Sequence, residues 1–316
     1  PPAISADNLT INGGTFYAGD ISANTVYGCA LPSGKSLMVE DPSNKSWLLD
    51  NGMAVAGTVF YTVVDEAQLG KYDVDGDGYE YNNRILTLKD GADVIVSSNG
   101  SVNDRIVVEE GARATLTLSG VEAYTDKPAI EVLPNGELTL VLDENSFNKL
   151  ETGWYRFGAI DVFGKLTIQG GGTLEVESDQ GPSIGETLST GSGATEINIA
   201  GGHIIANSII GGASTINDVT INISNGNVEA NAGIGGSHAT IHITGGNIKA
   251  KSGIVESFIN NAAIGAIEGG SCSIDIEGGI VYAENQYQCG AAIGTGINGT
   301  ATHIKITGGN IVAESG

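Results

Sequence analysis

The fold is decided by a phrase that recurs along the chain. It reads ITGGNIVAESG at residues 306–316 and ITGGNIKAKSG at residues 243–253, and a looser copy, LTINGGTFYAGD, occupies residues 9–20. Each copy joins an apolar-polar-apolar triplet to a glycine pair and a second apolar stretch. Self-similarity at a fixed period predicts a repeat architecture.

The triplets recur with a mean spacing of about 27 residues, which is in the range of repeat proteins that stack one structural unit on the next. Nine of them can be read in the sequence, starting at Leu86, Leu116, Leu138, Leu166, Ile197, Ile221, Ile241, Ile274 and Ile304. Each triplet is followed in the sequence by a glycine-rich turn, a strand that ends in a small residue, and a third short strand. The unit therefore contains three strands and three turns.

The middle residue of each triplet is polar, although both of its neighbours are apolar. From the second triplet onward these residues are Thr117, Thr139, Thr167, Asn198, Asn222, His242, Asp275 and Lys305. Because side chains alternate between the faces of a strand, one face of the stack should be solvated and the other should form a continuous apolar interior. The glycine pairs, such as Gly245-Gly246, would turn the corners. We predict an all-β, right-handed parallel β-helix with three short strands per coil and about nine coils, over residues 84–316.

The first part of the chain departs from the repeat. Residues 1–28 contain one isolated rung, which we interpret as the end of an upstream block. Residues 29–83 carry no repeat and are predicted to form an irregular module that includes a calcium loop.

Composition excludes several classes of partner. The formal charge of −23 comes from 37 acidic and 14 basic residues, so the surface should repel nucleic acid. No apolar run approaches the length of a membrane span. The three cysteines, Cys29, Cys272 and Cys289, have no metal-type spacing.

The sharpest local motif is YDVDGDGYEYNN, in which Asp73, Asp75 and Asp77 alternate before Gly78. This is the first half of a calcium loop, whose alternating carboxylates converge on one cation. The twelfth position, which should supply a bidentate acid, is Arg84, so Glu80 is the nearest additional ligand. The motif predicts a Ca²⁺ site, and the alternative is a solvated acidic hairpin turn built on Asp-Gly.

Catalytic carboxylates are scarce. Glu131 and Asp161 occupy equivalent third-strand positions in successive repeats and form the best acidic pair for a glycosidase-type reaction. Such residues more commonly belong to a solvated face, and no Arg or Lys accompanies them within their strands. They are weak candidates, and we assign no catalytic residue.

Aromatic residues gather where the repeat is interrupted. Trp154 and Tyr155 lie in GWYRFG, and Tyr282 and Tyr287 lie in a long unit that begins at Ile274. Aromatic rings stack on sugars, and insertions in repeat proteins map to outward loops, so these four residues are ligand-binding candidates. The alternative is that they cover the core beneath their own loops.

The phrases NNAAIGAIEGG, CGAAIGTGING, IDIEGGIVYAE and IKITGGNIVAES resemble the glycine-rich β-helix repeats of surface proteins of Gram-positive, gut-type bacteria. That family is described as adhesin-like or carbohydrate-binding. The resemblance covers residues 160–316 well and residues 85–160 loosely, and it implies an extracellular, cell-surface location without catalytic residues to carry over.

We therefore expect a non-catalytic, adhesin-like surface module that binds host or cell-wall polysaccharide. One alternative is a polysaccharide lyase or glycoside hydrolase of the β-helix type. The other is a purely structural stalk.

Overall fold

The computed structural model describes residues 4–10, 15–18, 21–27, 34–40, 46–49, 59–65, 69–153, 157–187, 194–212, 217–252, 261–286 and 290–315. Within these ranges every regular element is a β-strand, and no helix is long and apolar enough to cross a membrane. The prediction of an all-β chain is confirmed, and most of its strands belong to two long sheets of parallel strands.

The strands before residue 69 form two small sheets. β1 (Ile4–Thr10) pairs with β3 (Ile21–Tyr27) in parallel. β2 (Thr15–Ala18), β6 (Val59–Asp65), β4 (Lys35–Glu40) and β5 (Ser46–Leu48) form an antiparallel sheet in that order. Pairing of β2 with β6 links the predicted rung of residues 1–28 to the following segment, and the division at residue 28 stays a prediction.

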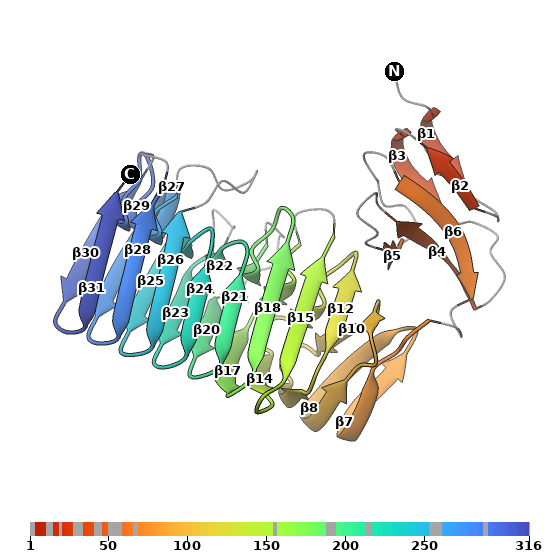
Figure 1. Ribbon diagram of the computed structural model, residues 1–316, viewed down its shortest axis with the longest axis horizontal. Coiled ribbons are helices and arrows are strands. Elements are labelled where there is room, and N and C mark those ends of the chain that lie inside the picture. The colour runs from red at the N-terminus through yellow and green to blue at the C-terminus, as the bar shows by residue number, and fades with distance from the viewer. Residues whose placement is uncertain are drawn as a thin grey trace.

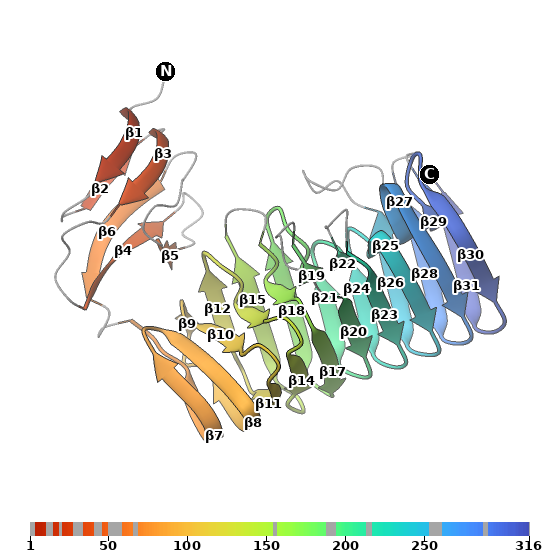
Figure 2. The same cartoon turned by 180° about the vertical axis from the view of Figure 1, so that it is seen from behind.

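From residue 85 onward the strands form three rows, and each strand pairs in parallel with its counterpart one repeat later (Figures 1 and 2). The first row contains the second part of β8 (Ile85–Ser97), β11 (Arg113–Leu118), β14 (Glu137–Leu142), β17 (Lys165–Gly170), β20 (Thr195–Ile199), β23 (Val219–Ile223), the second parts of β25 (Ile234–Ile243) and β27 (Ile264–Ile276), and β30 (Thr300–Ile306). The second row contains β9 (Ser101–Val102), β12 (Glu122–Thr125), β15 (Phe147–Thr152), β18 (Thr173–Ser178), β21 (His203–Ala206), β24 (Asn227–Ala230), β26 (Asn247–Ser252), β28 (Ile280–Asn285) and β31 (Asn310–Ser315). The third row contains the first part of β8, β10 (Arg105–Val108), β13 (Ile130–Val132), β16 (Ile160–Val162), β19 (Ile184–Glu186), β22 (Ile210–Gly212), the first parts of β25 and β27, and β29 (Ile293–Thr295).

The rows enclose one apolar core because most strands of the first and second rows alternate inward aliphatic and outward polar residues. Ile197, Ile221 and Ile241 lie in register on β20, β23 and β25, and each side chain is fully buried. The next residues of β20 and β23, Asn198 and Asn222, point outward. The Asn222 amide donates a hydrogen bond to Asn198 Oδ1 at 2.8 Å. Burial of a side chain such as Ile221 contributes about 1.5–3 kcal/mol, so the stack is held by a column of such contacts.

The register agrees with the predicted columns only from Leu138 onward. Leu138 pairs with Leu166, but Ala114 rather than Leu116 pairs with Leu138, so the column of outward residues contains Thr115 and not Thr117. Leu86 pairs with Ile106 and therefore belongs to the third row.

The glycine pairs turn the corners between the first and second rows, as predicted. Gly226 has a φ of 99° and Gly246 a φ of 88°. Residues with a Cβ are disfavoured at such angles, which explains why the second residue of each corner pair is glycine.

The acidic motif lies in β7 (Asp73–Asn82), which pairs antiparallel with β8. The hairpin turn is Asn83-Arg84, where φ is 49° and 62°, and not an Asp-Gly pair. Val74, Tyr79 and Tyr81 pack against the core from this hairpin, so β7 covers the apolar interior at the first repeat.

Candidate functional site

The outward side chains of the second row form a mostly polar surface, which we call the polar face, with Phe147, Ile280 and Val312 as exposed apolar residues on it. Its ionisable and amide residues include Glu122, Lys149, Glu151, Glu175, Glu177, His203, Asn227, Glu229, Asn247, Lys249, Lys251, Tyr282, Glu284, Asn310 and Glu314. They come from successive strands that are hydrogen-bonded about 4.8 Å apart, so the backbone fixes their spacing.

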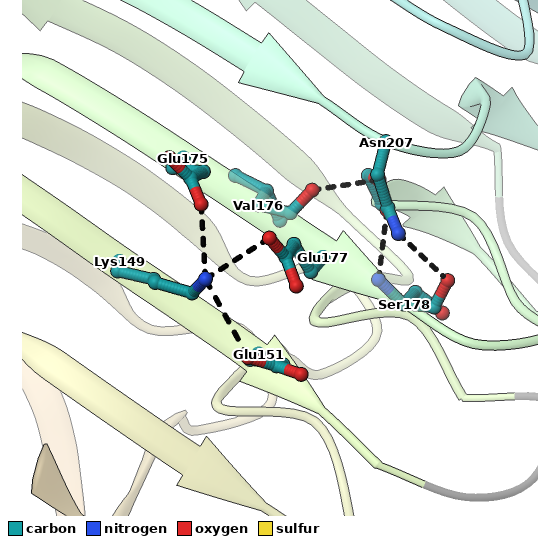
Figure 3. Close-up of polar contacts among 8 residues, drawn as sticks. Lys149, Glu151, Glu175, Val176, Glu177, Ser178 and Asn207 are labelled. Atoms are coloured by element: carbon teal, nitrogen blue, oxygen red, sulfur yellow. Dashed lines mark hydrogen bonds and ion pairs between the residues drawn. The ribbon is translucent and has the colours of Figure 1, made fainter. Parts of the chain in front are cut away.

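At one end of the polar face, Lys149 lies among acidic side chains (Figure 3). Its Nζ donates hydrogen bonds to Glu175 Oε1 and Glu177 Oε1, both at 3.0 Å, and lies 3.7 Å from Glu151 Oε2. Partial burial of the Lys149 ammonium disfavours its charge, but the hydrogen bonds that it donates to Glu175 and Glu177 outweigh this effect and raise the pKa of the lysine. The cation is therefore satisfied by the protein and has little capacity left for a ligand.

At the other end of the polar face there is a depression of about 460 Å³. It is lined by Asn227, Glu229, Asn247, Ile248, Lys249, Lys251, Tyr282 and Glu284. Lys249 is half exposed, and its Nζ lies 3.9 Å from Glu229 Oε2, beyond hydrogen-bond distance. The depression thus combines an aromatic ring with amide, carboxylate and ammonium groups on a regular sheet.

Tyr282 is held in this depression by its hydroxyl group. Its Oη donates to Glu314 Oε2 at 2.8 Å and lies 3.4 Å from Glu284 Oε2. The hydrogen bond to Glu314 and the neighbouring negative charges raise the pKa of Tyr282 to about 12. Lys251 in turn pairs with Glu284 at 3.3 Å. The ring is therefore neutral at physiological pH and fixed at one edge.

Glu131 and Asp161 are side by side, as the sequence predicts, because they are register partners on β13 and β16. Arg105, from β10, donates from Nη2 to Glu131 Oε2 at 2.8 Å, so a cation accompanies the pair from a neighbouring strand. Asp161 is only 2% exposed, and the backbone N–H and the hydroxyl of Thr187 donate to its two oxygens at 3.1 and 2.8 Å. The expectation of a solvated face is wrong for Asp161.

Burial raises the pKa of Asp161 to about 7, although the hydrogen bonds from Thr187 act to lower it. Glu186 is 1% exposed, and burial raises its pKa as well. Its Oε1 accepts a hydrogen bond from Asn217, whereas Oε2 has no partner in the described part of the chain. A glycosidase needs two carboxylates that reach the substrate, and Asp161 in this arrangement is closed to solvent.

The residues of the calcium motif are spread along an extended strand. Asp73, Asp75 and Asp77 are exposed on β7, and residues two apart in a strand lie about 7 Å from each other. The Asp75 carboxylate accepts a hydrogen bond from the N–H of Gly76 at 3.0 Å, and Glu80 lies 3.5 Å from Lys89 Nζ. The described residues contain no group of three or more His, Cys, Asp or Glu side chains placed to hold a metal ion.

Calcium binding stays a prediction from sequence, and it requires the strand to bend at the irregularity between Asp77 and Tyr79. If the motif binds calcium, the ion should stabilise the fold by about 1.4 kcal/mol at ten times its dissociation constant. Denaturation with and without millimolar Ca²⁺ measures this, and Asp75→Asn should abolish it. Equal stability of the wild type with and without millimolar Ca²⁺ would contradict the prediction.

Three of the aromatic candidates, Trp154, Tyr155 and Tyr287, lie outside the described residues. Among the described parts of the chain, sequence reasoning missed Lys249, Lys251 and Glu284 beside Tyr282, and Thr187 and Glu186 beside Asp161. Aligning the second-row strands on the small residue near their ends places Lys249 in the column of Tyr282, and Lys251 and Glu284 together in the next outward column. No local sequence signal marks Thr187 or Glu186.

Three comparisons, with protein-family models, with curated proteins and with solved structures, found no match to this chain.

Proposed function

We propose that residues 84–316 form a right-handed parallel β-helix with three short strands per coil and about nine coils. The parallel pairing of every strand with its counterpart one repeat later supports this interpretation. A right-handed path is expected because connections between parallel strands of one sheet almost always have that hand.

On this scaffold we propose a non-catalytic, adhesin-like surface module that binds glycans in the depression around Tyr282. The observation that carries the proposal is the placement of one fixed aromatic ring among exposed hydrogen-bonding groups. Sugar rings have apolar C–H faces that stack on aromatic side chains, and hydroxyl groups that bond to amides, carboxylates and ammonium groups.

The negative charge of the chain limits the classes of polymer that it can bind. With a formal charge of −23, the surface disfavours nucleic acid and strongly anionic polymers. A host or cell-wall polysaccharide is compatible with this charge. An extracellular, cell-surface location follows from the resemblance of the repeats to those of bacterial surface proteins, and is part of the same proposal.

A glycan array probed with the wild type and with Tyr282→Ala tests this function. We expect the wild type to bind a defined set of glycans and Tyr282→Ala to lose about tenfold or more in affinity, because the stacking ring is gone. Tyr282→Phe should retain most of the binding, since it keeps the ring.

The matched control is Val312→Ala, because Val312 is exposed and in register with Tyr282 but does not line the depression. It should bind as the wild type does. If Tyr282→Ala binds the same glycans with unchanged affinity, or if the wild type binds none, the proposed site is wrong.

A further inference from the structure

One column of the polar face consists of hydrogen-bonding side chains and is interrupted by a single isoleucine. The strands β21, β24, β26, β28 and β31 lie side by side in the second row (Figure 1). At their first position the register partners are His203, Asn227, Asn247, Ile280 and Asn310. Ile280 is 57% exposed, more than any other large apolar side chain in the described residues. A lone exposed isoleucine is ordinary, but this one borders the depression around Tyr282.

The two asparagines that precede Ile280 in this column offer hydrogen-bonding groups to a ligand. The side-chain amide of Asn247 donates to Asn227 Oδ1 at 3.0 Å, and both residues line the depression. This bond leaves Asn247 Oδ1 without a donor and Asn227 Nδ2 without an acceptor in the described part of the chain. Asn247 is exposed, so a ligand can reach its amide group. An acceptor and a donor are therefore available side by side.

The free amide oxygen, the isoleucine and the aromatic ring are close neighbours on the sheet. Ile280 and Tyr282 point to the same side of β28, because residues two apart in a strand share a face. Asn247 is the register partner of Ile280 on the adjacent strand β26. Adjacent strands are about 4.8 Å apart, and residues two apart in one strand about 7 Å. All three groups thus lie within the reach of one substituted sugar ring.

The charges in the depression are balanced. Two glutamates, Glu229 and Glu284, and two lysines, Lys249 and Lys251, contribute to its lining. Lys251 pairs with Glu284 at 3.3 Å, and Lys249 Nζ lies 3.9 Å from Glu229 Oε2. The depression therefore gives no advantage to an anionic uronic acid or to a cationic amino sugar. A neutral sugar suits it better than either.

We propose that the glycan bound in this depression contains N-acetylhexosamine. This inference rests on the proposed glycan-binding function and specifies the sugar. The pyranose ring stacks on Tyr282, the acetamido N–H donates to Asn247 Oδ1, and the acetamido methyl group packs on Ile280. In a trans amide the N–H and the methyl group lie on the same side, as the adjacent positions of Asn247 and Ile280 require. The amide of Asn227 is left for a hydroxyl group of the adjoining sugar.

Calorimetric titration of the full chain with triacetylchitotriose and with cellotriose tests the inference. These neutral trisaccharides share one backbone and differ only in the group next to the anomeric carbon, which is acetamido in the first and hydroxyl in the second. We expect triacetylchitotriose to bind at least about tenfold more tightly, because it adds an apolar contact and a hydrogen bond. Equal binding of the two trisaccharides would overturn the inference.

The deacetylated form of chitotriose separates recognition of the acetamido group from attraction of positive charge. It carries ammonium groups where triacetylchitotriose carries acetamido groups, and it should bind no more tightly than cellotriose. Tighter binding of the deacetylated trisaccharide than of triacetylchitotriose would show that the negative chain selects cations, and would also overturn the inference.

Variants locate the acetamido group. Ile280→Ser and Asn247→Ala should each weaken the binding of triacetylchitotriose by about fivefold, because each removes one of its contacts. Phe147→Ser is the matched control, since Phe147 is 55% exposed in the same column but lies on β15, outside the depression. It should leave the affinity within about twofold. Unchanged affinity in both Ile280→Ser and Asn247→Ala would contradict the placement.

The inference and the proposed function can fail separately. If both trisaccharides bind equally and Tyr282→Ala weakens both, glycan binding at Tyr282 stands and the preference for an acetamido group is wrong. The same holds if neither trisaccharide binds but another glycan of the array binds and depends on Tyr282. If no glycan binds, both are wrong.

Discussion

We expect Gly211→Ala to lower the free energy of unfolding by more than about 3 kcal/mol. Gly211 has a φ of 144°, and a Cβ built on it would lie 1.6 Å from the carbonyl oxygen of Gly235 in the next strand of the third row. Gly235 stands in the same relation to Gly265. The substitution would force adjacent backbones apart, and no side-chain rotation could relieve the contact. Urea denaturation of the wild type and the variant measures the effect.

Gly120→Ala is the matched control, because Gly120 also has a positive φ, of 79°, but a Cβ there would meet no atom within 4 Å. It should cost only about 1–2 kcal/mol, the strain of the backbone conformation alone. If the two variants lose equal stability, close stacking of the third-row strands is not what requires glycine at position 211.

We expect Asp161→Asn to remove a strong pH dependence of stability. Burial raises the pKa of Asp161 from 3.8 to about 7, so the folded state holds its proton more tightly than the unfolded state does. The stabilisation from the protonated carboxyl is complete below pH 4 and is lost as the pH rises to 7. The difference between the two pKa values corresponds to about 4 kcal/mol.

The measurement is urea denaturation of both proteins from pH 4 to pH 8. Wild-type stability relative to Asp161→Asn should fall across this range and stay constant above it. Asparagine can keep one hydrogen bond with Thr187 and carries no charge to bury. Asp143→Asn, at an exposed position, should retain the wild-type profile. A relative stability that rises with pH would show that Asp161 is stabilised as the anion.

The repeat could be predicted from sequence because its period is carried by core and corner residues. The register of the first repeats could not. The segments of β11 and β14 each contain three inward residues, so a slip of two positions keeps every side chain on its correct face. Leu116 therefore pairs with Leu140 and not with Leu138. Leu86 lies in the third row and not in the predicted first row, because β8 runs through two rows and contains two apolar stretches.

Individual site residues were harder to predict than the scaffold. The adjacency of Glu131 and Asp161 follows from counting repeats, but the hydrogen bonds to the buried Asp161 come from Thr187, which is 26 residues away in the chain. The acidic motif has the composition of a calcium loop, yet the pairing of β7 with β8 holds it as a strand. In both cases a tertiary contact, absent from the local pattern, decides the geometry.

A glycan-binding role without catalysis is tested by calorimetric titration with the strongest ligand from the glycan array, followed by analysis of that ligand for chain cleavage. We expect saturable binding by the wild type, at least about tenfold weaker binding by Tyr282→Ala, and an intact oligosaccharide at the end of the titration. Cleavage of the oligosaccharide, or equal binding by the wild type and Tyr282→Ala, would contradict a non-catalytic glycan-binding role centred on Tyr282.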